Sequence, residues 1–349
     1  MFIEPMLPKE DKLLTREDFK HYVFTRDRQS CVVCFKPAID AHHILERRLF
    51  KDGGYYLGNG VSVCTDCHIE AERTNISCEE LRQKANITKV ILPEHLYKDE
   101  VYDKWGNLIL PNKTRMKGEL FYEEPVQRIL EPYLSNFTHI VKFPRTFHLP
   151  WSPNLQNDDK MLESLDGFTG EEIVITEKMD GENTSMYSDY IHARALEYSP
   201  REDRNWIRAL HGRIKYDIPE GWRVCGENLY AEHSIHYDSL PSYFLMFSIW
   251  NNRNVCLSWD ETKTWAELLG LTMVKELYRG PFNRLFIQTL YGERVDQDKV
   301  EGHVIRVTRE FPYRDYKKVV GKYVRKGHIT TDEHWTKKAI VKNGLSNME

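Results

Sequence analysis

Long apolar runs are missing from this sequence. No segment reaches the ~18 consecutive apolar residues that a membrane-spanning helix requires, so we expect no membrane contact. Residues 1–12 have no apolar core and carry acidic side chains, so we expect no signal peptide there. Internal repeats, low-complexity tracts and a Walker-type phosphate loop are missing too. These absences predict a cytoplasmic protein that is neither a repeat protein nor a P-loop enzyme.

A large excess of charge of one sign is also missing. The chain has 49 Lys and Arg against 53 Asp and Glu, a net charge of −4, which by itself does not indicate a nucleic-acid-binding protein. The hydrophobic content of 41% and charged content of 29% are ordinary for a soluble globular protein. With 349 residues the chain is long enough for two or more domains, each with its own core.

Cysteine is sparse, at seven residues, but four of the seven form two pairs. Cys31 and Cys34 make one Cys-x-x-Cys motif, and Cys64 and Cys67 make a second. This spacing predicts a tetrahedral all-cysteine zinc site. Two disulfides are the alternative, against which the expected reducing compartment argues.

A histidine-rich motif lies between and beside the cysteine pairs. His42 and His43 are adjacent, Asn59 follows later, and His68 comes directly after Cys67. This order resembles the HNH endonucleases, a family with the ββα-metal fold. The resemblance implies that His42 and His68 bind a catalytic metal, that His43 is the general base, and that Asn59 fixes the loop geometry.

These residue types suit cleavage of a phosphodiester. A neutral imidazole can take a proton from water, and a divalent cation can stabilise charge on the scissile phosphate and its leaving oxygen. The sequence departs from the family at Glu72, where many members have a further histidine, although a glutamate can still ligate a hard cation. The alternative is a zinc-knuckle module that only binds nucleic acid or stabilises the fold.

A second motif, EKMDGEN, occupies residues 177–183. The β-branched segment 172–176 before it predicts a buried strand. Asp180-Gly181 predicts a hairpin turn, so Lys178 is expected at a strand end beside a sharp turn. On this pattern alone, Lys178 is either a solvated surface charge or a nucleophile.

Three further motifs follow in order: GENLYA at 226–231, EGHVIR at 301–306 and KKVVGKYVR at 317–325. Together with EKMDGEN they resemble the covalent nucleotidyltransferases, which include ATP-dependent DNA and RNA ligases and mRNA capping enzymes. The resemblance implies that Lys178 attacks the α-phosphorus of ATP, releases pyrophosphate and carries AMP as a phosphoramide.

The resemblance also implies the residues that hold the nucleotide. Glu177 and Asn183 flank the lysine and would help to place the nucleotide, and Arg194 matches an arginine that grips phosphate. Glu227 would accept hydrogen bonds from the ribose hydroxyls. Phe247 matches the aromatic residue that stacks on the purine, a contact that tolerates any base.

The last two motifs supply charge around the phosphates. By resemblance, Glu301 would hold a divalent metal through water, and Lys318, Lys322 and Arg325 would lie near the α-phosphate. Cations near Lys178 are expected to lower the pKa of its amine, so that it is neutral near pH 7.

Two features favour an RNA ligase within this superfamily. DNA ligases and capping enzymes usually have arginine at the position of Asn183, whereas asparagine is the RNA-ligase pattern. DNA ligases and capping enzymes also carry an OB-fold domain after the last motif. We expect no such domain here, because only a short segment follows Arg325. The alternatives are a DNA-nick or capping-type transferase, and a zinc-dependent HNH nuclease with a degenerate ligase domain.

The predicted fold class is α+β. We expect an HNH-like zinc module over 1–95, a connector over 96–138, and a nucleotidyltransferase domain of antiparallel sheets with flanking helices over 139–349. Within the last, Ser258 and Glu261 form a capping box that predicts a helix start. The expected cofactors are ATP, Mg²⁺ or Mn²⁺, and Zn²⁺. The expected partner is RNA in a repair reaction, with DNA or an RNA/DNA hybrid as the alternative.

Overall fold

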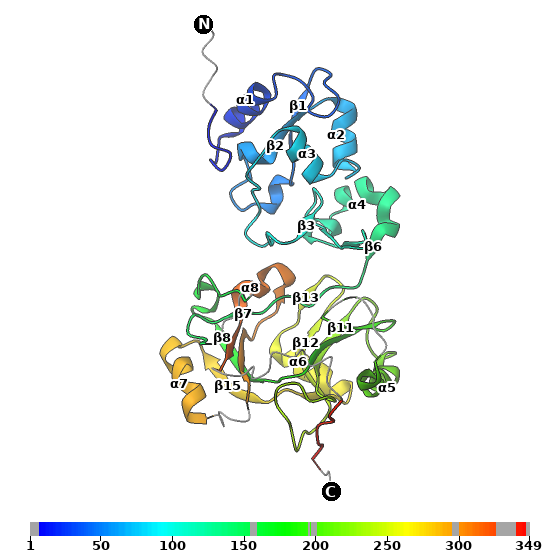
Figure 1. Cartoon of the computed structure of the whole chain (residues 1–349), viewed down its shortest axis with the longest axis vertical. Coiled ribbons are helices and arrows are strands. Elements are labelled where there is room, and N and C mark those ends of the chain that lie inside the picture. The colour runs from blue at the N-terminus through cyan, green and yellow to red at the C-terminus, as the bar shows by residue number, and fades with distance from the viewer. Residues whose placement is uncertain are drawn as a thin grey trace. The chain divides into compact units, whose positions relative to one another are not determined.

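The computed structural model describes residues 7–153, 159–194, 196, 201–294, 300–325 and 340–346. The chain divides into two compact units, Met1–Val141 and Lys142–Glu349, which we call the N-terminal and C-terminal units (Figure 1). Both mix helices with mainly antiparallel sheets, so the predicted α+β class is confirmed. Among the residues listed above, none of the helices has the length and apolar character needed to cross a membrane.

The first half of the N-terminal unit is a β-hairpin flanked by helices. Its elements are, in chain order, α1 (Arg16–Arg26), β1 (Asp40–His43), β2 (Gly60–Val63), α2 (Thr65–Glu72) and α3 (Cys78–Lys84). Strands β1 and β2 pair antiparallel, with His43 opposite Gly60. A Cβ at Gly60 would lie 2.5 Å from the ring of Phe19. Glycine at this position therefore allows α1 to pack closely on the hairpin.

The second half of the N-terminal unit is a small four-stranded sheet with one helix. Its elements are β3 (Val101–Tyr102), β4 (Leu108–Ile109), β5 (Arg115–Met116), α4 (Glu124–Leu130) and β6 (Phe137–Thr138). Trp105, Leu120 and Leu130 share one buried cluster with Ile44 and Val63 of the first half. The stretch predicted as a connector, 96–138, therefore belongs to the core of this unit.

Two sheets form the C-terminal unit. Their strands are β7 (Phe147–His148), β8 (Glu172–Lys178), β9 (Glu182–Met186), β10 (Ile191–Ala193), β11 (Arg223–Asn228), β12 (Phe244–Trp250), β13 (Val255–Cys256), β14 (Thr272–Met273), β15 (Glu276–Pro281), β16 (Gly302–Val307), β17 (Phe311–Pro312) and β18 (Val320–Val324). One sheet has the order β10-β9-β11-β12-β13-β17, with β14 beside β12, and the other has the order β15-β8-β16-β18-β7. The pairs β12–β14 and β18–β7 are parallel, and the other pairs are antiparallel.

Helices flank these sheets, as predicted. They are α5 (Asn205–Ile214), α6 (Trp259–Leu268), α7 (Arg284–Arg294) and α8 (Tyr316–Val319). The capping box before α6 is present: the Ser258 hydroxyl accepts from the Glu261 N–H at 3.3 Å, and the Glu261 carboxylate accepts from the Ser258 N–H at 3.1 Å. These bonds satisfy two backbone donors that the helix start would otherwise leave unpaired.

The hairpin prediction at Asp180-Gly181 is wrong. The two strands that the turn joins, β8 and β9, belong to different sheets. Gly181 does not adopt a positive φ. A Cβ there would instead lie 2.5 Å from the carbonyl oxygen of Asn228. Glycine at this position therefore allows two segments of the backbone to approach closely, and does not form a tight hairpin.

Candidate functional site

The four paired cysteines come together in the N-terminal unit. All four are free thiols, and their sulfur atoms lie within 4.8 Å of one another. The Sγ atoms of Cys34 and Cys64 are 3.5 Å apart, far longer than the ~2.05 Å of a disulfide. Thiolates bound at ~2.3 Å to one tetrahedral Zn²⁺ would lie ~3.8 Å apart, which this cluster fits.

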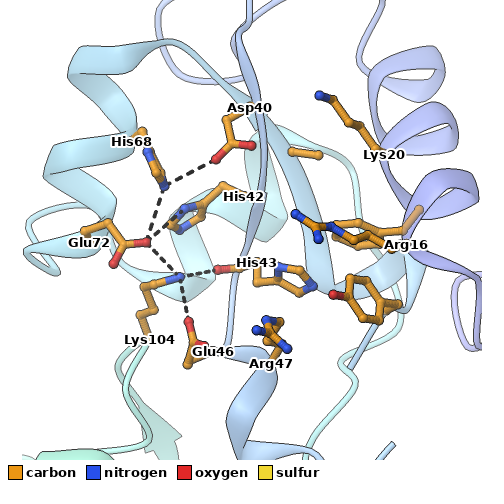
Figure 2. Close-up of a pocket in the computed structure, with 13 residues that line it drawn as sticks. Arg16, Lys20, Asp40, His42, His43, Glu46, Arg47, His68, Glu72 and Lys104 are labelled. Carbon is orange, nitrogen blue, oxygen red and sulfur yellow. Dashed lines mark hydrogen bonds and ion pairs between the residues drawn. The ribbon is translucent and has the colours of Figure 1, made fainter. Parts of the chain in front are cut away.

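A second cluster joins β1 to α2. His42 lies on β1, and His68 and Glu72 lie one turn apart on α2. The Oε1 atom of Glu72 is 3.5 Å from Nδ1 of His42 and 3.3 Å from Nε2 of His68 (Figure 2). Asp40 adds a carboxylate oxygen 3.5 Å from the same His68 nitrogen. These are the nitrogen and oxygen donors that divalent metals prefer.

The state of His42 fits metal binding. Its side chain is 2% exposed, and within the described part of the chain neither ring nitrogen has a hydrogen-bond partner. Burial, assisted by the charge of Lys104, holds the pKa of His42 well below its usual value. The imidazole is therefore neutral, with a lone pair available to a metal. Glu72 is charged, because His68 and Lys104 outweigh its burial and lower its pKa.

His43 points to the other side of β1, into a cavity of about 300 Å³ (Figure 2). Its ring stacks on Phe19, with ring centroids 4.5 Å apart, and meets Tyr55 edge-on. Burial, with a further contribution from Lys104, lowers the pKa of His43 to about 4, so its imidazole is neutral at pH 7. Besides Lys104, three cations line this cavity: Arg16, Lys20 and Arg47. A neutral base beside a basic wall suits a phosphodiester substrate.

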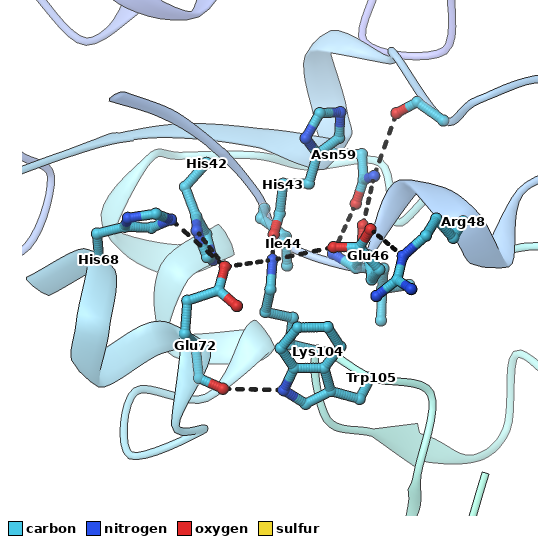
Figure 3. Close-up of polar contacts among 12 residues, drawn as sticks. His42, His43, Ile44, Glu46, Arg48, Asn59, His68, Glu72, Lys104 and Trp105 are labelled. Atoms are coloured by element: carbon cyan, nitrogen blue, oxygen red, sulfur yellow. Dashed lines mark hydrogen bonds and ion pairs between the residues drawn. The ribbon is translucent and has the colours of Figure 1, made fainter. Parts of the chain in front are cut away.

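Asn59 fixes the loop after β1, the role that the resemblance implied for it. Its side-chain oxygen accepts from the Leu45 N–H at 2.9 Å, and its amide donates to the Leu45 carbonyl at 3.0 Å (Figure 3). The amide also donates to the carbonyl of Gly54 at 3.2 Å. All of these atoms are buried, so the bonds restrain the backbone next to His43.

Lys104 is a residue of this site that the sequence did not reveal. It lies in the turn between β3 and β4, within the stretch predicted as a connector. Its ammonium donates to the carbonyl of His43 at 2.9 Å and lies 3.1 Å from Glu72 and 3.7 Å from Glu46 (Figure 3). The segment DKWGN at residues 103–107 carries no motif that marks its lysine.

Lys178 lies in the C-terminal unit, at the end of β8. Strand β16 pairs with β8 so that Gly302 is opposite Lys178, which brings Glu301 beside the lysine. The ammonium of Lys178 forms an ion pair with the carboxylate of Glu301. Two motifs far apart in the sequence are therefore joined by a direct contact.

Both sheets contribute to one cavity of about 640 Å³ around this ion pair. The predicted nucleotide residues that line it are Glu177, Lys178, Asn183, Arg194, Glu227, Phe247 and Lys322. Glu227 on β11 pairs with Asn183 on β9, so these two strands present their polar groups together. Within the described residues, the side-chain oxygen of Asn183 is buried without a hydrogen-bond partner. Such an atom is expected to meet a ligand.

Three predicted residues, Glu301, Lys318 and Arg325, do not line this cavity, although Glu301 contacts Lys178, which does. The carbonyl of Lys318 lies against Gly167, where a Cβ would be 2.2 Å away. Arg325 donates from Nε to the carbonyl of Val300 at 3.0 Å. Of the three cations predicted near the α-phosphate, the structure brings only Lys322 into the cavity.

Further polar contacts join residues of the cavity to one another and to neighbouring side chains. Lys322 lies 3.2 Å from Asp159, whose carboxylate is also 3.1 Å from Nε2 of His148. In addition, Arg204 forms a two-nitrogen ion pair with Glu182 on the cavity wall. The sequence separation between these partners leaves no spacing signal.

Asp180 braces the loop next to the lysine. Its carboxylate accepts from the N–H groups of Ser234 and Ile235 at 2.7 and 2.9 Å, and its own N–H donates to the hydroxyl of Tyr237 at 2.9 Å. A carboxylate with two backbone donors holds its position well. The Asp-Gly pair of the motif is therefore structural in this chain.

The expected lowering of the Lys178 pKa is not found. Burial disfavours the charged amine, but the carboxylates of Glu301 and Glu227 outweigh it and the pKa of Lys178 is raised. Burial raises the pKa of Glu227 to about 8 and also raises that of Glu177. Lys178 is therefore held as an ammonium until its carboxylate partners are neutralised or engaged elsewhere.

Replacing Glu301 tests this electrostatic account. The Glu301→Gln change removes the nearest negative charge and leaves burial, which lowers the pKa of the lysine. The pH profile for labelling of Lys178 by a small acylating reagent, in chelator without added metal, is therefore expected to move to lower pH. Mass spectrometry of the Lys178 peptide measures it, with Glu171→Gln on the surface as control. A profile that stays in place or moves to higher pH would contradict the account.

Comparisons with known proteins agree with the position of this cavity. A family model described as RNA ligase matches residues 171–324, which supports the ligase part of the sequence-based prediction. These bounds contain Lys178, Glu227, Glu301 and Lys322. Comparison with curated protein sequences gives no match.

Solved structures with some likeness to the chain include three ligases. A protein assigned as an ATP-dependent DNA ligase from Aquifex aeolicus is 19% identical, with 53% of this chain and 50% of that chain covered and a TM-score of 0.37. An archaeal ATP-dependent RNA ligase is 17% identical, with 53% and 48% covered and a TM-score of 0.37. A mutant RNA ligase of Naegleria gruberi with ATP and Mn is 15% identical, with 77% and 72% covered and a TM-score of 0.38. The chain thus spans about half the length of the first two.

Proposed function

We propose that the chain is an ATP-dependent RNA ligase that carries an HNH-like nuclease module in its N-terminal unit. The observation that carries the ligase proposal is that Lys178, which forms an ion pair with Glu301, lines one cavity together with six other predicted nucleotide residues. The RNA-ligase family match over residues 171–324 contains most of the residues that line this cavity and supports the same conclusion.

In the proposed first step, Lys178 loses a proton and its nitrogen attacks the α-phosphorus of ATP. An N–P bond forms, the bond between the α-phosphorus and its bridging oxygen breaks, and pyrophosphate leaves. An oxygen of the 5′-phosphate of an RNA strand then attacks the phosphorus of the bound AMP, a P–O bond forms, the N–P bond breaks, and the lysine amine is released. A 3′-hydroxyl attacks that phosphate and displaces AMP, which seals the strand. A divalent metal held near Glu301 would neutralise phosphate charge.

The residues around Lys178 would position the nucleotide. Glu227, half-buried on β11, would accept hydrogen bonds from ribose hydroxyls, and Phe247 on β12 offers an aromatic face for the base. Arg194 and Lys322 would bind phosphate oxygens. Their placement around Lys178 would matter because transfer of a nucleotidyl group depends mainly on positioning and on neutralisation of phosphate charge.

For the N-terminal unit we propose metal-dependent cleavage of a phosphodiester. His43 would take a proton from the attacking water, and the basic wall of Arg16, Lys20 and Arg47 would hold the neighbouring phosphates. His42, His68 and Glu72 would bind the divalent metal, which would stabilise charge on the scissile phosphate. Zn²⁺ on the four cysteines would tie the turn that contains Cys31 and Cys34 to the start of α2.

The substrate class is tested by offering matched nicks in RNA, in DNA and in an RNA/DNA hybrid with the same sequence. We expect a nick with an RNA 3′-hydroxyl strand to be sealed at least roughly tenfold faster than the all-DNA nick, because a protein that contacts the 2′-hydroxyl distinguishes RNA from DNA. Time courses with ATP and Mg²⁺ measure this ratio. Faster sealing of the DNA nick would favour the DNA-ligase alternative instead.

A further inference from the structure

The N-terminal cavity contains a buried cation that the proposed nuclease role does not use. Lys104 is 4% exposed, and three oxygens surround its ammonium. They belong to the His43 carbonyl at 2.9 Å, to Glu72 at 3.1 Å and to Glu46 at 3.7 Å (Figure 3). A buried charge is tolerated only when it is paired and hydrogen-bonded, and these oxygens meet that condition. The ammonium is therefore held at the edge of the cluster.

The glutamate oxygen next to Lys104 is the one that faces both histidines. Oε1 of Glu72 lies 3.5 Å from Nδ1 of His42, 3.3 Å from Nε2 of His68 and 3.1 Å from the Lys104 ammonium. A divalent ion bound by this oxygen and the two nitrogens, ~2.0–2.2 Å from each, would share Oε1 with the ammonium. Two cations on one buried oxygen repel each other strongly.

We propose that Lys104 competes with the divalent metal for Glu72 and so sets how tightly this cluster binds metal. The inference rests on the proposed role of His42, His68 and Glu72 as a metal site. When metal binds, the Lys104 ammonium gives up Glu72 and keeps its hydrogen bond to the carbonyl of His43.

Glu46 offers the displaced ammonium a second partner. Its Oε2 atom lies 3.7 Å from Lys104, while its Oε1 atom accepts from Arg48 at 3.0 Å. The backbone around Lys104 is fixed to α2, because the indole N–H of Trp105 donates to the Glu72 carbonyl at 2.9 Å. A short movement of the lysine side chain, without movement of the backbone, therefore exchanges one carboxylate for the other.

The test is a titration of the zinc-loaded full-length protein with Mn²⁺ in the absence of ATP. The electron paramagnetic resonance signal of free Mn²⁺ measures how much has bound. Lys104→Met keeps much of the side-chain length without the charge and is expected to bind Mn²⁺ roughly tenfold more tightly, because a like charge has been removed nearby. Glu46→Gln is expected to bind it several-fold more weakly, because the ammonium then relies on Glu72. His68→Ala identifies the binding that belongs to this cluster.

A double-mutant cycle separates competition from a general effect of charge. In the Lys104→Met background, Glu46→Gln is expected to change Mn²⁺ affinity much less than it does in the native background. Unchanged zinc content and thermal unfolding show that each variant is folded, and Glu46→Gln in the native background supplies a test even if Lys104→Met unfolds. If folded Lys104→Met binds Mn²⁺ no more tightly than the native protein, or if Glu46→Gln binds Mn²⁺ more tightly, the inference is overturned and the metal site remains. If His68→Ala removes none of the Mn²⁺ binding that the native protein shows, the metal site itself is refuted.

Discussion

Replacement of Lys178 by alanine is expected to lower ATP-dependent sealing of a 5′-phosphorylated RNA nick by at least about a thousandfold, because no other group can carry the AMP. The same variant is expected to retain measurable sealing of a strand that already bears AMP on its 5′-phosphate. That last step forms the phosphodiester directly from the 3′-hydroxyl and does not require the lysine nitrogen as a nucleophile. Gel-based time courses with the two substrates measure both rates.

The matched control is Lys215→Ala, which removes a lysine just beyond α5 that does not line the cavity. It is expected to leave both rates unchanged. Equal loss on both substrates in Lys178→Ala would point to a damaged fold, which its thermal unfolding would reveal. Full sealing with ATP by a folded Lys178→Ala variant would contradict the proposed covalent step.

Replacement of His43 by alanine is expected to lower metal-dependent nucleic-acid cleavage by about 10²–10⁴-fold, the usual contribution of a positioned general base. The ring of His43 faces the cavity between Phe19 and Tyr55 and is not a member of the metal cluster. Mn²⁺ binding should therefore persist in this variant. Cleavage of a labelled single strand, with and without a chelator, measures the loss.

His21→Ala is the control for this experiment, because it removes an exposed histidine of α1 that is outside the cavity. Cleavage at the native rate by a folded His43→Ala variant would contradict the role of His43 as the general base. The two reactions should also separate: His43→Ala is expected to seal normally, and Lys178→Ala to cleave normally.

Local signals in the sequence were sufficient to find much of each site. The cysteine pairs predicted a cluster whose four thiols do meet, and Ser258 with Glu261 predicted a helix start that is present. Strand patterns placed Lys178 at the end of β8. In each case the determinant is a spacing or a propensity within a short segment, which the chain keeps when it folds.

The remaining features depend on contacts between distant segments. Lys104 reaches the metal cluster only because the predicted connector folds into the same core, and no short pattern encodes that. Asp180-Gly181 predicted a hairpin because the preference of these residues for a turn is local. The assignment of β8 and β9 to different sheets depends on pairing with distant strands, which the turn residues do not encode. The raised pKa of Lys178 likewise reflects two carboxylates from other strands, Glu227 and Glu301.

The most direct test of the central claim is covalent labelling of the purified protein with α-labelled ATP and Mg²⁺. Intact mass is measured first, and pyrophosphate is added to remove any AMP already attached. Denaturing electrophoresis followed by peptide mass mapping then locates the label. The account predicts an acid-labile AMP adduct on the peptide that contains Lys178, absent from Lys178→Ala. A protein that carries no AMP at the start and acquires none, or an adduct on another residue, would contradict it.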